Sequence, residues 1–335
     1  MTRRDLLLGA GATAASLAAL KTDAAPASQN RLIDVHHHFQ PTGKNNDGHE
    51  WSQQMAIEEL DSNRVAAAIG WCGQVNADNF EEGRAQARSW NEWATSFCGD
   101  YPGRLGLFAS LPFRDVEGAL KEIDYAFDTL KVDGVGLSTN YGDLWLGDAL
   151  FQPIWKELNR RGAAVYIHPT GAPCCSPKTL SYQTGAISPP WLEFPINTAR
   201  TILSLLASGT TRRFPAIKFI FCHGGGVMPL LVGRIAGFND WRAVGQEKLD
   251  GLFPDGIYEE YRKLYFECAQ AYTPEAMTMV RSLVPDSHIL FGSDFSYFPI
   301  AHSVRLFEGL KLPPKVRSGI AGENAGALFP RFKSA

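Results

Sequence analysis

The chain lacks several features that define common classes of protein. Its six cysteines form no CxxC pair and no zinc-ribbon spacing, which excludes the usual structural zinc modules. A net charge of -3 and the absence of a basic run argue against a nucleic-acid or membrane-surface partner. No internal repeat or low-complexity linker follows residue 30, and a 45% apolar composition argues against disorder. What remains is an ordinary globular chain with enough residues for a large core.

The N-terminal residues predict an export signal. Arg3 and Arg4 directly precede an apolar stretch that ends at Leu20, and small residues at 25–27 suit a cleavage site. The stretch is short and rich in alanine and glycine, which favours export over a membrane anchor. We therefore expect a twin-arginine signal that is read by the export machinery, and a periplasmic or exported protein. The predicted division is a signal over 1–27 and a metal-dependent barrel over 28–335.

Eight short apolar runs alternate with amphipathic segments after the signal. The runs are rich in Val, Ile, Leu and Phe without polar alternation, which is typical of buried parallel strands. Strands are predicted at 31–37, 64–70, 104–109, 133–138, 163–168, 217–222, 264–268 and 288–292. Helices are predicted at 79–99, 115–130, 150–161, 197–208, 228–238, 274–283 and 299–310. The pattern predicts an α/β fold, a (β/α)8 TIM barrel, and 335 residues suit a single barrel.

Histidines and an aspartate follow the ends of four predicted strands. His36 and His38 are two apart on the first strand and so share a face, whereas the histidine between them faces the other way. His168, His223 and Asp294 end later strands. Polar residues at the carboxyl ends of barrel strands converge on one face, and these residue types bind divalent metals. Each residue alone would suit a structural role, but together they predict a metal site.

The cysteines divide into two groups. Cys72, Cys222 and Cys268 lie in or beside apolar runs and are most simply small core residues. Cys174 and Cys175 are adjacent in a proline-rich loop. A disulfide between neighbours would form a strained ring, so we expect two thiols there.

The order of these residues resembles the amidohydrolase superfamily. Further motifs resemble its aminocarboxymuconate semialdehyde decarboxylase-like branch, from about residue 30 to the C-terminus. They are Trp191-Leu192-Glu193-Phe194-Pro195, Thr198, Arg200, Arg213-Phe214-Pro215, His223-Gly224-Gly225-Gly226, Pro229, Gly233, Arg234, Gly292-Ser293-Asp294 and Asn324-Ala325. The segments 139–148 and 168–175 look most similar to 6-methylsalicylate decarboxylase-like proteins.

The resemblance implies roles for the polar residues. His36, His38, His168 and Asp294 would hold one divalent ion, with zinc favoured and manganese as the alternative. His223 would lie beside this site and share proton transfer with Asp294. No lysine follows the fourth predicted strand, so a carboxylated lysine bridging two metals is not expected.

The resemblance also implies substrate contacts and a homodimer. Arg234 would reach the neighbouring subunit's pocket and meet the substrate carboxylate. Residues 71–74 offer no match for the family's second substrate arginine, which favours an aromatic monocarboxylate over a dicarboxylate. Trp191 is placed in a loop after the fifth strand, where it would line the pocket. Tyr141 and Trp145 either line it or fold their loop over the core.

The expected reaction is non-oxidative decarboxylation of a hydroxybenzoate or methylsalicylate-like acid. Asp294 or His223 would protonate the ring carbon that bears the carboxylate, and CO2 would leave. The metal would act as a Lewis acid. The alternative is a hydrolase of a lactone, ester or amide that uses the same site to activate water.

Overall fold

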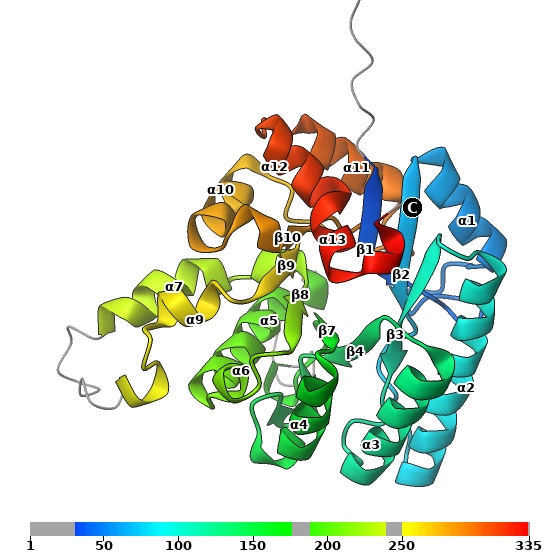
Figure 1. Ribbon diagram of the computed structural model, residues 1–335, viewed down its shortest axis with the longest axis horizontal. Coiled ribbons are helices and arrows are strands. Elements are labelled where there is room, and N and C mark those ends of the chain that lie inside the picture. The colour runs from blue at the N-terminus through cyan, green and yellow to red at the C-terminus, as the bar shows by residue number, and fades with distance from the viewer. Residues whose placement is uncertain (1–30, 176–187, 239–249, 334–335) are drawn as a thin grey trace, which may run out of the picture.

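The computed structural model describes residues 31–175, 188–238 and 250–333 and shows a parallel barrel (Figure 1). Eight strands pair in parallel in the order β1-β2-β3-β4-β7-β8-β9-β10. Their bounds are β1 Leu32–His38, β2 Val65–Trp71, β3 Leu105–Ser110, β4 Gly134–Ser138, β7 Ala164–His168, β8 Lys218–Phe221, β9 Tyr265–Glu267 and β10 Ile289–Leu290. All eight predicted strands and the predicted barrel are confirmed. The predicted signal, residues 1–27, lies outside the described ranges.

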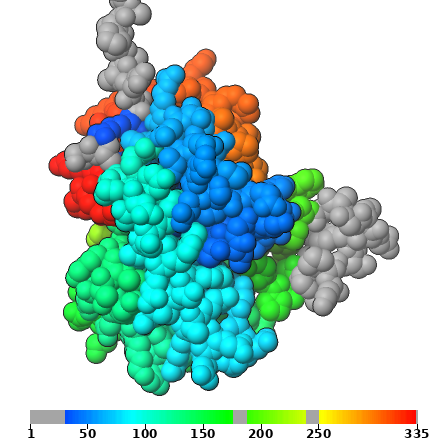
Figure 2. Space-filling model, turned by 90° about the vertical axis from the view of Figure 1, so that its right-hand side faces the viewer, coloured from blue at the N-terminus to red at the C-terminus, as the bar shows by residue number. Residues whose placement is uncertain are grey.

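Helices surround the barrel between the strands (Figure 1). Their bounds are α1 Gln53–Ser62, α2 Phe80–Asp100, α3 Val116–Tyr125, α4 Gln152–Arg161, α5 Pro189–Ala207, α6 Thr210–Arg213, α7 Met228–Gly237, α9 Ile257–Tyr261, α10 Pro274–Leu283, α11 Ile300–Gly309, α12 Pro314–Ser318 and α13 Asn324–Leu328. Figure 2 shows α1 and the loop before it, in blue, above α2, in cyan. Side-chain caps at Ser52, Asn79, Asp115 and Thr273 satisfy backbone N–H groups where four helices begin. Across the described ranges, no helix is long and apolar enough to cross a membrane.

The helix predicted over 197–208 was placed too late. It begins at Pro189 as α5, so Trp191 lies in its first turn and not in a loop. Two prolines open the helix. They are tolerated there because the N–H groups of a helix's first turn have no partner within the helix, so proline's missing N–H costs nothing. Pro195 lies inside the helix. The stretch 139–149, predicted as irregular, contains a small antiparallel pair, β5 Asn140–Tyr141 and β6 Leu144–Trp145.

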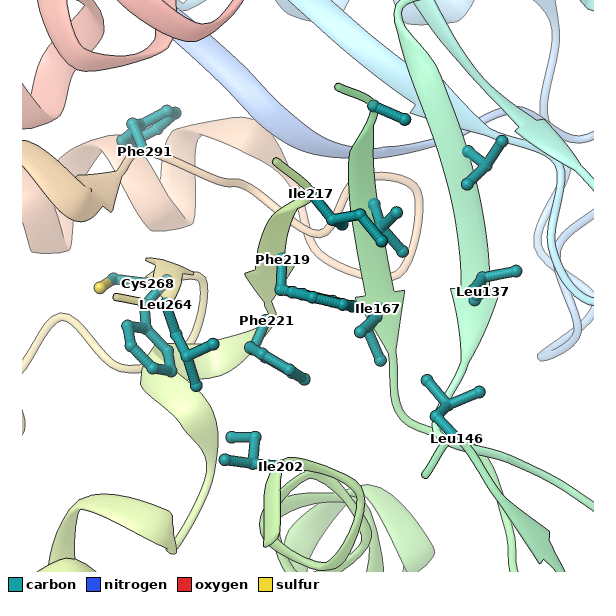
Figure 3. Packing of buried hydrophobic residues seen from close by; sticks show 14 of the residues in the cluster. Leu137, Leu146, Ile167, Ile202, Ile217, Phe219, Phe221, Leu264, Cys268 and Phe291 are labelled. Carbon is teal, nitrogen blue, oxygen red and sulfur yellow. The ribbon is translucent and has the colours of Figure 1, made fainter. Parts of the chain in front are cut away.

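Strand side chains alternate between two apolar cores. Phe219 and Phe221 of β8 belong to the layer between the barrel and its helices, where they lie near Ile202 of α5 (Figure 3). Ile220 and Cys222 belong to the barrel interior. This alternation explains why each strand reads as a continuous apolar run, because both faces of a strand are buried.

The C-terminal segment belongs to the interior core. Phe329 and Phe332, which follow α13, share the interior cluster with Phe108 and Tyr166. The rings of Phe108 and Tyr166 stack with centroids 5.1 Å apart, and Phe329 meets Phe108 edge-on. The interior is therefore filled with side chains, and polar chemistry is confined to the carboxyl ends of the strands.

Candidate metal centre and active site

The four predicted ligands converge at the carboxyl ends of the strands. One donor atom from each of His36, His38, His168 and Asp294 lies within 4.8 Å of the others. The Nε2 atoms of His36 and His38 are 3.2 Å apart, and Asp294 Oδ1 is 3.1 Å from each of them. His36 is fully buried, and His38 and Asp294 are nearly so.

A bulge in β1 lies between Asp34 and His37, around the candidate ligand His36. Asp34 pairs with Ala68 and His37 with Gly70, so β1 holds one residue more than β2 over this interval. Val35 therefore joins the interior core, and His36 still turns inward with the cluster. Bulges next to active sites commonly re-aim side chains in this way.

Hydrogen bonds fix how two of the imidazoles face the cluster. His36 Nδ1 is 2.8 Å from Glu267 Oε1, and His168 Nδ1 is 2.8 Å from the carbonyl oxygen of Pro169. A carbonyl or carboxylate can only accept, so both Nδ1 atoms donate and both Nε2 lone pairs remain available. Three imidazole nitrogens and one carboxylate oxygen in a buried cluster fit one divalent ion.

Glu267 is a site residue that the sequence prediction missed. Its Oε1 accepts from His36 Nδ1 and from the backbone N–H of His223, and its Oε2 accepts from the N–H of Ala269. A Cβ at Gly292 would come within 2.1 Å of Glu267 Oε2, so only glycine fits there. The available signal was a lone carboxylate at the end of an apolar run, Tyr265 to Cys268.

Asp34 fastens the first strand to the last. Its Oδ1 accepts from the N–H groups of His36 and Ser293, at 3.0 and 2.9 Å. Its Oδ2 accepts from the Ser293 hydroxyl at 2.6 Å and pairs with His37 Nδ1 at 3.1 Å. His37 thus points away from the metal cluster, as predicted, and serves this junction.

His223 and Asp294 share a contact at the edge of the cluster. His223 Nε2 is 3.4 Å from Asp294 Oδ2, while Oδ1 of the same carboxylate faces the other three ligands. Both residues have left-handed backbones, with φ of 56° and 64°. Such strain at non-glycine residues is typical of functional sites. The turn continues through Gly226, where a Cβ would strike the carbonyl oxygen of Pro195 in α5.

Burial and the neighbouring charges set the protonation states of the four candidate ligands before a metal binds. Burial lowers the pKa of His38, and burial together with the nearby histidines lowers the pKa of His168 well below its ordinary value. Burial opposes charge on His36 and Asp294 as well, but their mutual attraction, with Glu267 beside His36, outweighs it. The pKa of His36 is raised well above its ordinary value and that of Asp294 is lowered well below. A cation would replace the proton on His36, so binding releases a proton.

A cavity of about 1160 Å³ opens over the cluster. His38, His168, His223 and Asp294 form part of its wall. Aromatic and other apolar groups make up much of the rest, including Trp71, Trp90, Phe194, Val227, Leu230, Met279 and Val280. Trp191 lines the cavity and is 74% exposed, which places it at the mouth. Among the described lining residues there is no lysine or arginine.

The other predicted substrate contacts lie outside the described wall of this cavity. Tyr141 is buried and stacks on Phe113, and its hydroxyl accepts from the N–H of Ser138. Trp145 lies 6.0 Å beneath the guanidinium of Arg200. Arg234 is exposed on α7, with its guanidinium 5.3 Å from the ring of Phe238. For Arg234 this position is compatible with a role toward a second subunit, which stays a prediction.

The fold and the donor set agree with a family match. The amidohydrolase family model matches residues 33–331, and the chain belongs to this family. Decarboxylase yanB of Aspergillus niger is 33% identical over 328 residues, covering 90% of this chain and 88% of that protein. The 6-methylsalicylic acid decarboxylase of Penicillium expansum is 33% identical over 322 residues, covering 90% and 97%.

A solved structure shows the same fold. A dihydroxybenzoic acid decarboxylase from Polaromonas sp. JS666, with bound manganese and the inhibitor 2-nitroresorcinol, superposes with a TM-score of 0.76. The two sequences are 20% identical, and the match covers 90% of this chain and 97% of that one. The predicted enzyme class, a carboxy-lyase of the amidohydrolase superfamily, is confirmed.

Loss of a ligand side chain should remove the metal. We expect His36→Ala and Asp294→Ala to lose both the metal and the activity, because three remaining donors hold the ion too weakly. Metal analysis of the purified variants by mass spectrometry measures this directly. His49→Ala, which changes an exposed histidine, is the control and should keep its metal. Full occupancy in either ligand variant would disprove the assignment.

Glu267→Gln should weaken metal binding while the protein stays folded. A glutamine has one acceptor oxygen where Glu267 accepts on both, so an N–H group of the chain would face the amide NH2. We expect metal affinity to fall about 10- to 100-fold, the usual effect of losing a carboxylate behind a ligating histidine. Competition with a chelator measures the affinity, and Glu308→Gln at an exposed position is the matched control. Unchanged affinity would show that Glu267 only supports the fold.

Proposed function

We propose that this chain catalyses the metal-dependent, non-oxidative decarboxylation of a small aromatic acid, such as a hydroxybenzoate or a methylsalicylate. The observation that carries this proposal is the pairing of His223 with Asp294 at the edge of the ligand cluster, inside an apolar cavity. The relatives named as decarboxylases of 6-methylsalicylic and dihydroxybenzoic acids support it.

The wall of the cavity favours an acid with one carboxylate. Trp71, Gly73 and Gln74 line the side where the family's second substrate arginine would be expected, and none carries charge. A second carboxylate would have no cationic side chain to meet among the described lining residues, and burying it unpaired would be costly. Aromatic side chains offer a planar ring favourable contacts instead.

The divalent metal would be held by His36, His38, His168 and Asp294, and it would polarise the oxygens of the bound acid as a Lewis acid. We propose zinc as the ion, with manganese as the alternative. A proton shared between His223 Nε2 and Asp294 Oδ2 lies at the wall of the cavity, where it can pass to the ring carbon that bears the carboxylate. The 3.4 Å separation is long for a hydrogen bond, and such contacts commonly shorten when substrate binds.

The proposal includes the cell compartment and the assembly. The twin-arginine motif at Arg3 and Arg4 supports export through the corresponding machinery. The exposed position of Arg234, outside the wall of its own cavity, supports a homodimer in which it serves the neighbouring site.

The proposed chemistry is tested with metal-loaded protein and a panel of hydroxybenzoates and methylsalicylates. We expect mass spectrometry to show loss of CO2 from at least one acid. His223→Ala should keep its metal and lose turnover about 100-fold or more, the usual scale for a removed acid–base group. Loss of metal from this variant would instead make His223 a ligand. If the protein instead converts a lactone, ester or amide to a product that has gained water, and releases no CO2 from any acid, its reaction is hydrolysis and not decarboxylation.

Arg234→Ala should weaken substrate binding strongly while the fold and the metal survive. If the arginine serves the neighbouring subunit, mixing Arg234→Ala with His36→Ala should restore one working site per heterodimer. The intact metal site of the first subunit is then served by the intact arginine of the second. Activity after subunit exchange measures the recovery.

The control for subunit mixing is a pair that cannot complement. His36→Ala mixed with His38→Ala has no intact metal site in either subunit and should stay inactive. Heterodimers of Arg234→Ala and His36→Ala without recovery would show that Arg234 acts within its own subunit or not at all.

A further inference from the structure

Two adjacent thiols lie in the loop that follows β7, the strand that ends at the candidate ligand His168. The Sγ atoms of Cys174 and Cys175 are 3.0 Å apart in the reduced pair, as expected from the sequence. Cys174 is exposed and Cys175 is half-buried. Arg200 of α5 brings Nη1 to 3.5 Å from each sulfur.

The remaining four cysteines are poor targets for oxidation. Burial raises the pKa of Cys98 and of Cys222 to about 12, and raises those of Cys72 and Cys268 well above the ordinary value. The thiolate is the reactive form, so these four react slowly. The contact with Cys175 raises the pKa of Cys174 too, but Arg200 opposes the shift and Cys174 is open to solvent. Its reactivity should therefore increase as the pH rises.

The thiol pair is joined to the active-site loop by two side chains. Arg200 Nη1 donates to Asn197 Oδ1 at 3.0 Å, and Asn197 Nδ2 donates to the carbonyl oxygen of Thr170 at 2.8 Å. Thr170 lines the cavity, and Pro169 beside it accepts from His168 Nδ1. Asn197 is fully buried, so this chain of contacts has little freedom to move. The backbone next to a metal ligand is thus held in part by Arg200.

We propose that Cys174 and Cys175 are a site of reversible oxidation to a vicinal disulfide, which loosens the hold of Arg200 on the loop that directly follows His168. The oxidant is a small disulfide such as oxidised glutathione. One cysteine thiolate attacks this disulfide, forms a mixed disulfide with one half of the reagent and releases the other half as a thiolate. The second cysteine then attacks the sulfur of the first, which closes the vicinal disulfide and releases the remaining half of the reagent. The pair loses two electrons and two protons, and the reagent becomes two thiols.

The geometry makes this disulfide easy to reduce again. The Cα atoms of neighbouring residues are about 3.8 Å apart, closer than the usual span of a disulfide, so the bond is strained. Strained, exposed disulfides are the labile and regulatory ones. In the reduced protein, Arg200 Nη1 donates to both sulfur atoms. The sulfurs of a disulfide are weaker acceptors than those of thiols or thiolates, so oxidation weakens these two contacts of Arg200.

The test uses the full-length, metal-loaded protein with oxidised glutathione. After digestion, mass spectrometry should find the peptide containing both cysteines lighter by two hydrogen atoms, and dithiothreitol should restore it. The oxidised protein should release its metal to a chelator several-fold faster than the reduced protein, because His168 is held less firmly. This second readout does not depend on the substrate or on the proposed reaction.

Two variants separate this site from the other thiols. Cys98→Ser should oxidise and release metal as the wild type does, whereas Cys174→Ser should show neither the internal disulfide nor the faster release. Arg200→Ala should react more slowly with oxidised glutathione at neutral pH, since the thiolate loses its neighbouring cation. Separate glutathione adducts on the two cysteines, or equal metal-release rates in the two redox states, would overturn the proposal.

Discussion

The junction at Asp34 is the constraint on which the rest of the site depends. One buried carboxylate accepts from β1 and from Ser293 after β10, so the first and last strands of the barrel are fixed to each other. Together with the backbone hydrogen bond from the Asp294 N–H to the His36 carbonyl oxygen, this junction holds His36 beside Asp294, although the two come from opposite ends of the chain. The metal cluster needs donor atoms within a few tenths of an ångström of fixed positions, and a barrel closed only by apolar packing would not supply that.

A second buried carboxylate organises the other half of the site. Glu267 accepts from the side chain of His36 and from the backbone of His223, so the candidate metal cluster and His223 are held by the same carboxylate. The left-handed turn at His223 is held by Glu267 through its backbone N–H, and that at Asp294 by a hydrogen bond from its N–H to the carbonyl oxygen of His36. One buried carboxylate therefore positions both His36 and His223.

The loop after β7 contributes to the site in two ways. Pro169 and Thr170, directly after His168, line the cavity, and the thiol pair a few residues later contacts α5 through Arg200. A long helix that begins at Pro189 is what brings Arg200 and Asn197 against this loop. The same helix places Trp191 at the mouth of the cavity, and this position depends on the early start of the helix.

The barrel could be predicted from the sequence alone, and so could the four candidate ligands that the structure brings together. Buried parallel strands are apolar on both faces, so their runs are visible without a structure, and His36, His38, His168 and Asp294 end such runs. Only the tertiary structure identified Asp34 and Glu267, because a buried carboxylate is recognised by its partners, and those lie more than 200 residues away. The start of α5 was also hidden, since Pro195 resembles a helix boundary until Gly226 is seen packed against it. Side-chain spacing shows which residues can share a face; only packing decides which of them meet.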